Sequence, residues 1–223
     1  MILSVKKPAC RVLRYKTYRS MPWRNGRGST LEIARDPANG EEFAWRLSLA
    51  DIKEDGDFSA YAGYRRALVL IAGKSLCLRF KGHGHCFLHT VGRGTRFDGD
   101  WKTHCAVPGG HCTDLSLIVS RGSAGHPASV VRAPLLLRLK STRRVIVSKG
   151  LHAAIFVLDR PVSITEPAST RPRTVRARDT LLVSPGPERT LTLRGLEPST
   201  PAHVVVLQWR PGVPHHMSPL PKP

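Results

Sequence analysis

The sequence predicts an all-β protein built as a sandwich or a barrel. Apolar and polar residues alternate over short runs, Gly, Pro, Asn and Asp interrupt these runs, and few windows keep the 3.6-residue period of a helix. The 223 residues are enough for one large β domain or for two smaller ones. Because both halves of the chain are rich in expected strands, we predict a barrel that is duplicated within one chain.

The first expected element is a hairpin. Its strands are residues 31–35 (LEIAR) and 41–52 (EEFAWRLSLADI), and the loop between them ends in Asn-Gly, which suits the positive φ of a tight turn. In the second strand, large apolar residues occupy every second position from 43 to 49. This alternation predicts one apolar face and one largely polar face.

The polar face of this hairpin is the first candidate site. If the two strands pair symmetrically about Ala38, Thr30, Glu32, Arg46 and Ser48 share one surface. Glu32 and Arg46 are then diagonal neighbours, about 7–8 Å apart at Cα, which is within side-chain reach. The surface could be a solvated sheet face or the lining of a cavity, and the sequence leaves both interpretations open.

The remaining expected strands follow at short intervals. They lie at residues 66–71, 75–80, 114–119, 144–148, 153–158, 162–165, 174–176, 179–184, 190–194 and 203–209. A stretch rich in Gly, Ser and Pro at 121–127 separates the two groups of strands. We therefore expect an N-terminal barrel half at 1–122, a C-terminal half packed on it at 123–210 and a Pro-rich tail at 211–223.

The composition excludes several classes of protein. Hydrophobic residues make up 41% and charged residues 23% of the chain, which argues against disorder, collagen and coiled coil. No apolar run approaches the about 18 residues of a membrane-spanning helix, and the first residues do not resemble a signal peptide. We expect a cytoplasmic protein with no membrane partner. The five cysteines form no CxxC pair and are expected to be free thiols.

The net charge of +19 raises nucleic acid as an alternative partner, because clustered cations release counterions from phosphates. The excess of basic residues is spread over both halves, however, and no run of five like charges occurs. Aromatic residues make up only 6% of the chain and form no platform for base stacking.

No metal or cofactor is assigned. His83, His85 and His89 have spacing similar to that of a metal-binding β-barrel, but no Glu follows a few residues later and the flanking glycines indicate a turn. A zinc site made of the three histidines is the alternative. A second group of residues that could bind a metal lacks the paired spacing of a zinc site, and we interpret its proximity in the sequence as coincidence. The group is His104, Cys105, His111 and Cys112. The sequence also contains no GxSxG, HExxH or phosphate-binding P-loop.

The segment before the first hairpin, residues 21–30 (MPWRNGRGST), is the second candidate site. Its glycines allow tight backbone curvature, and Trp23 beside Asn25 combines an apolar wall with an amide that donates and accepts hydrogen bonds. Such a loop suits a small polar ligand, although a purely structural turn is the alternative.

Four blocks of the sequence resemble the HutD/Ves family, small cupin-type proteins associated with histidine utilisation in bacteria. The blocks are residues 21–34 (MPWRNGRGSTLEIA), 43–73, 97–100 (FDGD) and 109–122 (GGHCTDLSLIVSRG), in matching order and spacing. Together they cover about the first 55% of the chain, and it is their combination that makes the resemblance specific.

The resemblance implies a cupin-like double-stranded β-helix barrel, duplicated in one chain and without the usual metal ligands. It also implies that the protein binds a histidine-degradation intermediate such as formimidoylglutamate and restrains expression of the pathway. The pocket positions carried over from the family are Trp23, Asn25, Thr30, Glu32, Arg46, Ser48, Asp51, Ser59, Arg66 and Asp114. The chain departs from the family pattern at four positions, which bear on the identity of the ligand: Arg27, Asp57, Arg65 and Ser116.

Three hypotheses follow. In the first, the protein binds a small carboxylate metabolite, with Arg46 or Arg66 taking the carboxylate and Glu32 orienting a guanidinium or meeting a cationic nitrogen. In the second, the same barrel is an enzyme with Glu32 or Asp114 as general base. In the third, the protein is a basic regulator that associates with nucleic acid.

Overall fold

The protein folds almost entirely into β-strands. A computed structural model describes residues 9–23, 28–37, 42–122, 128–166, 169 and 171–212. In this part of the chain there are twenty strands and one 3-10 helix, η1 (Tyr15–Thr17), and no helix is long and apolar enough to cross a membrane. The predicted all-β class is therefore confirmed.

The chain forms two compact units. One, the N-terminal unit, comprises Thr17–Leu135 together with the residues from Trp209 onward; the other, the C-terminal unit, comprises the residues up to Lys16 together with Leu136–Gln208. The sequence placed a single division after residue 122. Among the described residues, the first strand (Cys10–Leu13) pairs within the C-terminal unit, and residues 209–212 belong to the N-terminal unit.

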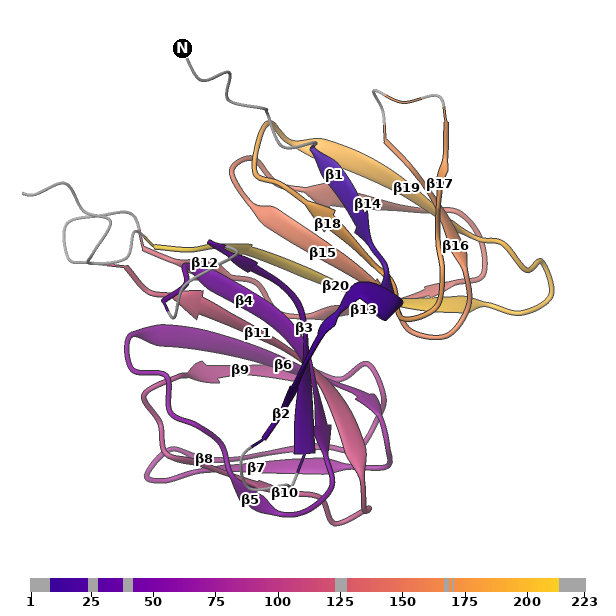
Figure 1. The fold of residues 1–223 in the computed structure, drawn as a ribbon. Coiled ribbons are helices and arrows are strands. Elements are labelled where there is room, and N and C mark those ends of the chain that lie inside the picture. Colours follow the sequence, from indigo (N-terminus) through magenta and orange to yellow (C-terminus); the bar gives the residue numbers. More distant parts are fainter. Residues whose placement is uncertain are drawn as a thin grey trace, which may run out of the picture. The chain divides into compact units, whose positions relative to one another are not determined.

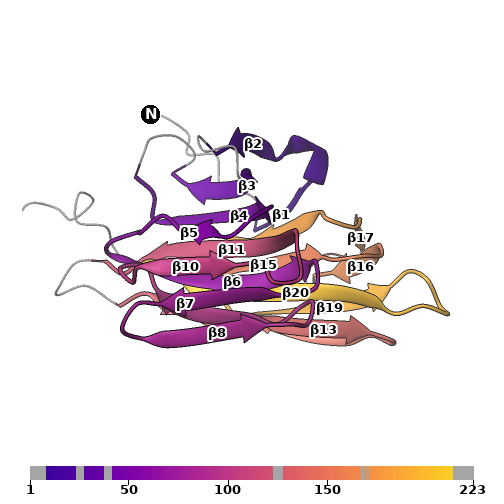
Figure 2. The ribbon, with the colours of Figure 1, turned by 90° about the horizontal axis from the view of Figure 1, so that it is seen from below.

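Two antiparallel sheets build the N-terminal unit (Figure 1). The six-stranded sheet has the order β2 (Arg19–Pro22), β3 (Gly28–Asp36), β4 (Trp45–Ile52), β11 (Cys112–Ser120), β6 (Tyr64–Ala72) and β9 (Gly94–Asp98). Figure 2 shows β2, β3 and β4 following one another along one side of this sheet. The four-stranded sheet has the order β5 (Gly56–Asp57), β10 (Thr103–Ala106), β7 (Leu76–Phe80) and β8 (Gly84–Leu88).

The C-terminal unit also has two sheets. One has the order β1 (Cys10–Leu13), β18 (Thr180–Val183), β15 (His152–Val157), β20 (Ala202–Arg210) and β12 (Val130–Val131), with β13 (Leu135–Leu139) also paired to β20. The end of β20 and β12 belong to the N-terminal unit. The second sheet has the order β14 (Arg143–Val147), β19 (Arg189–Gly195), β16 (Val162–Thr165) and β17 (Arg173–Val175).

Eight consecutive strands in each unit pair in the same way. In the N-terminal unit β4 and β6 flank β11, β9 pairs with β6, and β10 lies between β5 and β7, which pairs with β8. In the C-terminal unit β13 and β15 pair with β20, β18 pairs with β15, and β19 lies between β14 and β16, which pairs with β17. Shared pairing order is what a duplicated barrel would produce, and the duplication itself stays a prediction.

The structure confirms the expected strands of the C-terminal half to within one or two residues. The alternation of Val, Leu and Ile with polar residues was the signal, since it places one face of each strand in a core. Several strands were missed because they are short or rich in His and Gly. These are β1, β2, β5, β8, β9, β10, β12 and β13.

The expected register of the first hairpin was wrong, while the expected faces were right. Glu32 lies opposite Ser48 rather than opposite Ala44, and a bulge at Ile33 shifts the pairing further along the strands. The second strand begins at Trp45, so the connection is longer than the five-residue turn assumed from the sequence, part of which lies outside the described residues. Because the ladder up to Glu32 is displaced by an even number of residues, each of these side chains keeps its predicted face.

Candidate functional site

A group of polar side chains lies on the inner face of the six-stranded sheet of the N-terminal unit. In the ladders Glu32 is opposite Ser48, Ser48 is opposite Ser116, and Ser116 is opposite Leu68. Leu68 belongs to the apolar cluster that the sheet shares with β7, so these side chains point between the two sheets. The hairpin face that the sequence left open is therefore an interior face.

We define the polar cluster as the buried members of this face. Each has less than a tenth of its surface exposed, which is unusual for charged residues unless they are paired or functional. The cluster consists of Glu32, Ser48, Arg66, Asp114 and Ser116.

Arg66 is the cation at the centre of the cluster. Its guanidinium carbon lies 5.1 Å from the ring centroid of Phe58 and 5.0 Å from that of Phe97, so two aromatic faces hold it by cation–π attraction. Its Nη1 donates to the carbonyl oxygen of Ser59 at 3.3 Å. Burial lowers the pKa of Arg66 to about 10, with Asp114 acting in the opposite direction. The side chain therefore stays cationic at neutral pH.

Asp114 is the deepest acid of the cluster, with 1% of its surface exposed. Neither carboxylate oxygen has a hydrogen-bond partner among the described residues. Burial raises the pKa of Asp114 to about 7, and the positive charge of Arg66 limits the rise. A carboxyl group in this state can hold or release a proton near neutral pH.

Other polar atoms of this face are buried and unsatisfied in the same way. The Nε atoms of Arg46 and Arg66 and the Oγ of Ser116 have no hydrogen-bond partner within the described part of the chain. Most buried polar groups of native proteins have a partner, so this set of orphaned donors and acceptors makes the inner face the candidate functional site.

Arg46 stands at the edge of the polar cluster and is partly buried. It is two residues from Ser48 on the same face and therefore remains a diagonal neighbour of Glu32, as the sequence predicted. Its Nη2 donates to the hydroxyl of Tyr61 at 2.8 Å, and its guanidinium lies 5.3 Å from the ring centroids of both Tyr61 and Phe43.

Tyr61 connects the two arginines, because its ring also lies 5.6 Å from the guanidinium of Arg66. The sequence reasoning did not select Tyr61, Phe58 or Phe97 as site residues. Phe58 and Tyr61 lie between β5 and β6, where no strand periodicity marks which side chains turn inward. Their aromatic character close to Arg65-Arg66 in the sequence was the one available signal.

Trp23 and Thr30 lie beside the cluster and contact each other. The indole Nε1 of Trp23 donates to the Oγ1 of Thr30 at 2.9 Å, and the ring packs against the apolar cluster between the sheets. A Cβ atom at Gly28 would come within 2.9 Å of the indole and 2.3 Å of a backbone oxygen, which explains why only glycine fits there.

Two of the candidate residues do not contribute a side chain to the polar cluster. Asp51 occupies the alternate set of β4 positions, the opposite face from Ser48, where its carboxylate contacts Nε2 of His111. Ser59 is exposed, and its backbone carbonyl rather than its hydroxyl contacts Arg66. Asn25 lies outside the described residues.

The histidines that the sequence raised as possible metal ligands do not gather into one group with other metal-binding side chains among the described residues. Among the described residues no group of three His, Cys, Asp or Glu side chains is placed to hold a metal ion. His83 stacks on Trp101 at 4.2 Å between ring centroids, and His89 stacks on the exposed Phe87 at 5.8 Å. All five cysteines are free thiols, as expected.

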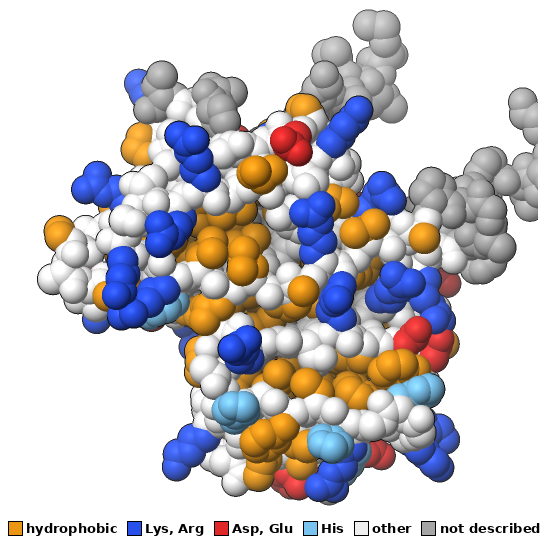
Figure 3. Space-filling model, turned by 180° about the vertical axis from the view of Figure 1, so that it is seen from behind, with side chains coloured by type: hydrophobic (Ala, Val, Ile, Leu, Met, Phe, Trp, Pro, Cys, Tyr) orange, Lys and Arg blue, Asp and Glu red, His pale blue; other side chains and the backbone are white. Residues whose placement is uncertain are grey.

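The positive charge is dispersed in the structure as it is in the sequence. On the face drawn in Figure 3, Lys and Arg side chains are scattered over the surface and do not gather in one continuous patch. The polar cluster is therefore the feature with the most specific chemistry. It combines one guanidinium group, two carboxyl groups and two hydroxyls inside a sheet-lined interior, with the guanidinium of Arg46 at its edge.

The sequence was compared with known proteins. The sequence model of the HutD family matches residues 15–198. An uncharacterized 21.2 kDa protein in the hutC 3' region of Pseudomonas putida is 40% identical over 108 residues, which are 48% of this chain and 56% of that protein. The matched region thus spans little more than half the length of this curated relative.

Two solved structures are similar over most of the chain. A conserved protein of unknown function from Pseudomonas aeruginosa PAO1 has a TM-score of 0.78 and 31% identity, covering 90% of this chain and 98% of that one. HutD from Pseudomonas fluorescens SBW25 has a TM-score of 0.70 and 29% identity, covering 91% and 100%. Oxalate decarboxylase from Lactobacillus farciminis, at 7% identity, 92% and 86% coverage and a TM-score of 0.63, shows a likeness of fold alone.

Proposed function

The chain belongs to the HutD family and has its cupin fold, and from this premise we propose that it binds a small carboxylate-bearing metabolite at the polar cluster of the N-terminal unit. The binding would modulate histidine utilisation in the cytoplasm. Formimidoylglutamate, a histidine-degradation intermediate with a cationic formimino group next to one carboxylate and a second carboxylate at the far end of its side chain, is the specific ligand we propose.

One observation carries this proposal. Both units have an apolar interior cluster and a buried aspartate. Asp179 of the C-terminal unit accepts hydrogen bonds from Arg14 and Tyr15, whereas among the described residues neither carboxylate oxygen of Asp114 in the N-terminal unit has a partner. Burial of unpaired polar groups destabilises a fold, so the difference supports a ligand role for the cluster rather than a structural one.

Each polar residue has a role that its chemistry allows. The guanidinium groups of Arg46 and Arg66 would take a carboxylate through charge-assisted bonds. Asp114 and Glu32 would meet the cationic nitrogen, and the hydroxyls of Ser48 and Ser116 supply neutral donors and acceptors. Exclusion of water between the sheets would strengthen each of these contacts.

The link to histidine utilisation rests on the relatives. The curated relative from Pseudomonas putida is described by its place in the hutC 3' region, and the similar structure from Pseudomonas fluorescens is named HutD. These names support the pathway, and the polar cluster supports the ligand class.

Isothermal titration calorimetry with formimidoylglutamate tests the proposal. We expect binding by the wild-type protein, a loss of at least about tenfold in affinity for Arg66→Gln, and unchanged binding for Arg79→Gln. Arg79 is an exposed arginine on β7 of the other sheet and serves as the matched control. If formimidoylglutamate, glutamate and histidine all give no heat, the ligand class is excluded.

The state of Asp114 favours a second candidate function, an enzyme that uses this carboxyl as general base. A buried carboxyl whose pKa is raised to about 7 is suited to take a proton at neutral pH. Turnover of a bound metabolite that is lost in Asp114→Asn, with binding retained, would support catalysis. Binding without any chemical change, followed by NMR over hours, would support the binding role.

A further inference from the structure

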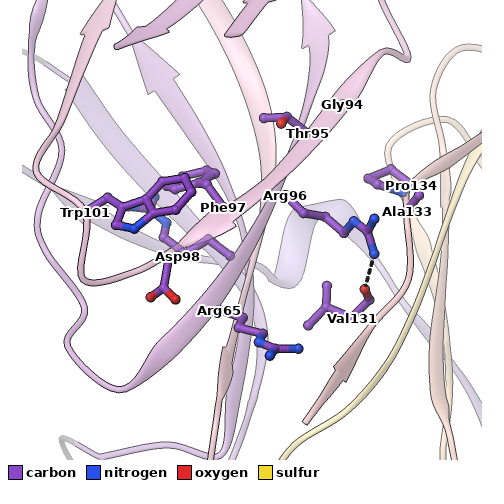
Figure 4. A pocket seen from close by; sticks show the side chains of 11 residues that line it. Arg65, Gly94, Thr95, Arg96, Phe97, Asp98, Trp101, Val131, Ala133 and Pro134 are labelled. Atoms are coloured by element: carbon purple, nitrogen blue, oxygen red, sulfur yellow. Dashed lines mark hydrogen bonds between the residues drawn. The ribbon is translucent and has the colours of Figure 1, made fainter. Parts of the chain in front are cut away.

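A groove of about 540 Å³ lies on the N-terminal unit along strand β9 and meets the candidate site at Arg66 and Phe97 (Figure 4). Residues 94–98 of β9 form one wall, and the rest of the lining consists of Arg65, Arg66, Trp101, Val131, Ala133 and Pro134. In Figure 4 Trp101 and Phe97 lie on one side of the β9 ribbon, while Arg96 and Val131 lie on the other.

Strand β9 is the last strand of its sheet. It pairs with β6 from Arg65 opposite Asp98 to Val69 opposite Gly94, and no other described strand pairs with it. The terminal strand of a sheet has backbone N–H and C=O groups available on its free edge, and an extended peptide can pair with them as an added strand. The groove follows this edge, so a segment of about five residues has room beside β9.

The crossing segment 131–134 is held close to β9 at two points. Arg96 Nη1 donates to the carbonyl oxygen of Val131 at 2.9 Å, drawn as a dashed line in Figure 4. At Gly94 a Cβ atom would come within 3.1 Å of Pro134 Cγ, so the Pro134 ring packs close against the backbone of β9. These contacts give the groove a fixed second wall.

The charge of the groove is positive. Arg65 and Arg96 are exposed and lie on the same face of the sheet, because Arg65 opposes Asp98 and Arg96 opposes Ala67. The one acid of the lining, Asp98, accepts a hydrogen bond from Nη1 of Arg121 at 2.8 Å and is neutralised by it. An acidic partner therefore fits this groove better than a basic one.

We propose that this groove binds an extended acidic peptide segment, which adds as a strand to the free edge of β9. Side chains of a strand point alternately to its two faces. Those on the face of Arg65 and Arg96 are acidic, and those on the face of Phe97 and Trp101 are apolar. The groove therefore prefers a peptide whose sequence alternates acidic and apolar residues.

Fluorescence anisotropy with three labelled octapeptides tests the proposal on the full chain. One peptide alternates Glu and Val, the second alternates Lys and Val, and the third has the Glu and Val residues in two blocks. We expect the alternating Glu peptide to bind at least about fivefold more tightly than either of the others, because each exposed ion pair contributes about two- to fivefold. Methylation of alternate peptide nitrogens, which removes strand hydrogen bonds, should abolish its binding.

Charge reversal at the groove separates recognition from a structural effect. Arg96→Glu should weaken the alternating Glu peptide and strengthen the alternating Lys peptide, whereas Arg79→Glu on the other sheet should change neither. A thermal melt checks that each variant folds, and Arg96→Lys, which keeps the charge, should retain the preference for Glu. Equal binding of all three peptides, or no binding, overturns the proposal. Arg96 lies on the opposite face of the sheet from Phe97 and Arg66. Titration with formimidoylglutamate should therefore be unaffected by Arg96→Glu, which distinguishes a failure of this proposal from a failure of the proposed barrel ligand.

Discussion

Arg66 and Asp114 lie on adjacent strands of one sheet, face the same interior, and shift each other's ionisation. The positive charge of Arg66 opposes the rise in the pKa of Asp114, and the negative charge of Asp114 opposes the fall in the pKa of Arg66. Desolvation remains the larger effect on both groups. The mutual attraction of the two charges therefore offsets only part of the free energy that it costs to bury them.

The stability of the protein should fall as the pH rises towards 7. The pKa of Asp114 is raised to about 7 in the folded state and is about 3.9 in an unfolded chain, so between these values the folded state holds the extra proton. The contribution of this group is complete below about pH 4 and is lost above about pH 7, on the order of 4 kcal/mol in total. Urea unfolding at pH 5 and pH 8 measures the part of this free energy that is lost between these two pH values, about 3 kcal/mol. Asp114→Asn should be less sensitive to pH than the wild type, and equal sensitivity of the two would contradict this origin.

Replacement of Arg66 should destabilise the fold most at alkaline pH. Arg66→Gln removes the cation that compensates Asp114 and raises the pKa of that carboxyl further, at a cost of about 3–5 kcal/mol where Asp114 is ionised. At pH 5 Asp114 is protonated, so the loss should be smaller. Unfolding curves of the variant at both pH values check this difference. If Arg66→Gln lowers the unfolding free energy equally at pH 5 and pH 8, the main cause of the loss is the missing packing against Phe58 and Phe97.

Tyr61→Phe should loosen Arg46 without disrupting the aromatic contacts. The change removes the hydroxyl that accepts from Arg46 Nη2 at 2.8 Å and keeps the ring that lies over both guanidinium groups. We expect a loss of about 1 kcal/mol in unfolding free energy and a several-fold loss in affinity for a carboxylate ligand. Differential scanning calorimetry and titration calorimetry measure the two effects. Tyr64→Phe, whose hydroxyl donates to the carbonyl of Phe43, is the matched control and should alter stability alone.

The cysteines should differ in reactivity towards a thiol reagent such as DTNB. Burial raises the pKa of Cys10 and of Cys112 to about 12 and also raises the pKa of Cys105, so these three thiols should be inert in the folded protein. Cys77 and Cys86 are partly exposed and should react first. Counting the thiols modified before and after addition of urea tests the assignment. Rapid modification of all five in buffer would indicate a more open interior than the structure has.

The strands and their faces were predictable because burial imposes a period of two on the sequence. That period alone predicted a polar face with Thr30, Glu32, Arg46 and Ser48. An even displacement of the register keeps these side chains on the same face. The register itself was not predictable, since it depends on the length of the connection and on the bulge at Ile33. Arg66 and Asp114 entered through the resemblance to a family and not through any local pattern.

By itself, the sequence determined that the chain is all-β, to which family it belongs, and which hairpin residues share a face, because local alternation and motif order depend only on neighbouring residues. The tertiary structure decided what that face meets. Long-range pairing places Arg66 and Asp114 beside the hairpin, brings Tyr61 over both arginines, and leaves β9 as the free edge of a sheet. Such contacts join residues far apart in the chain, and the free energy that selects them comes from burial between the two sheets.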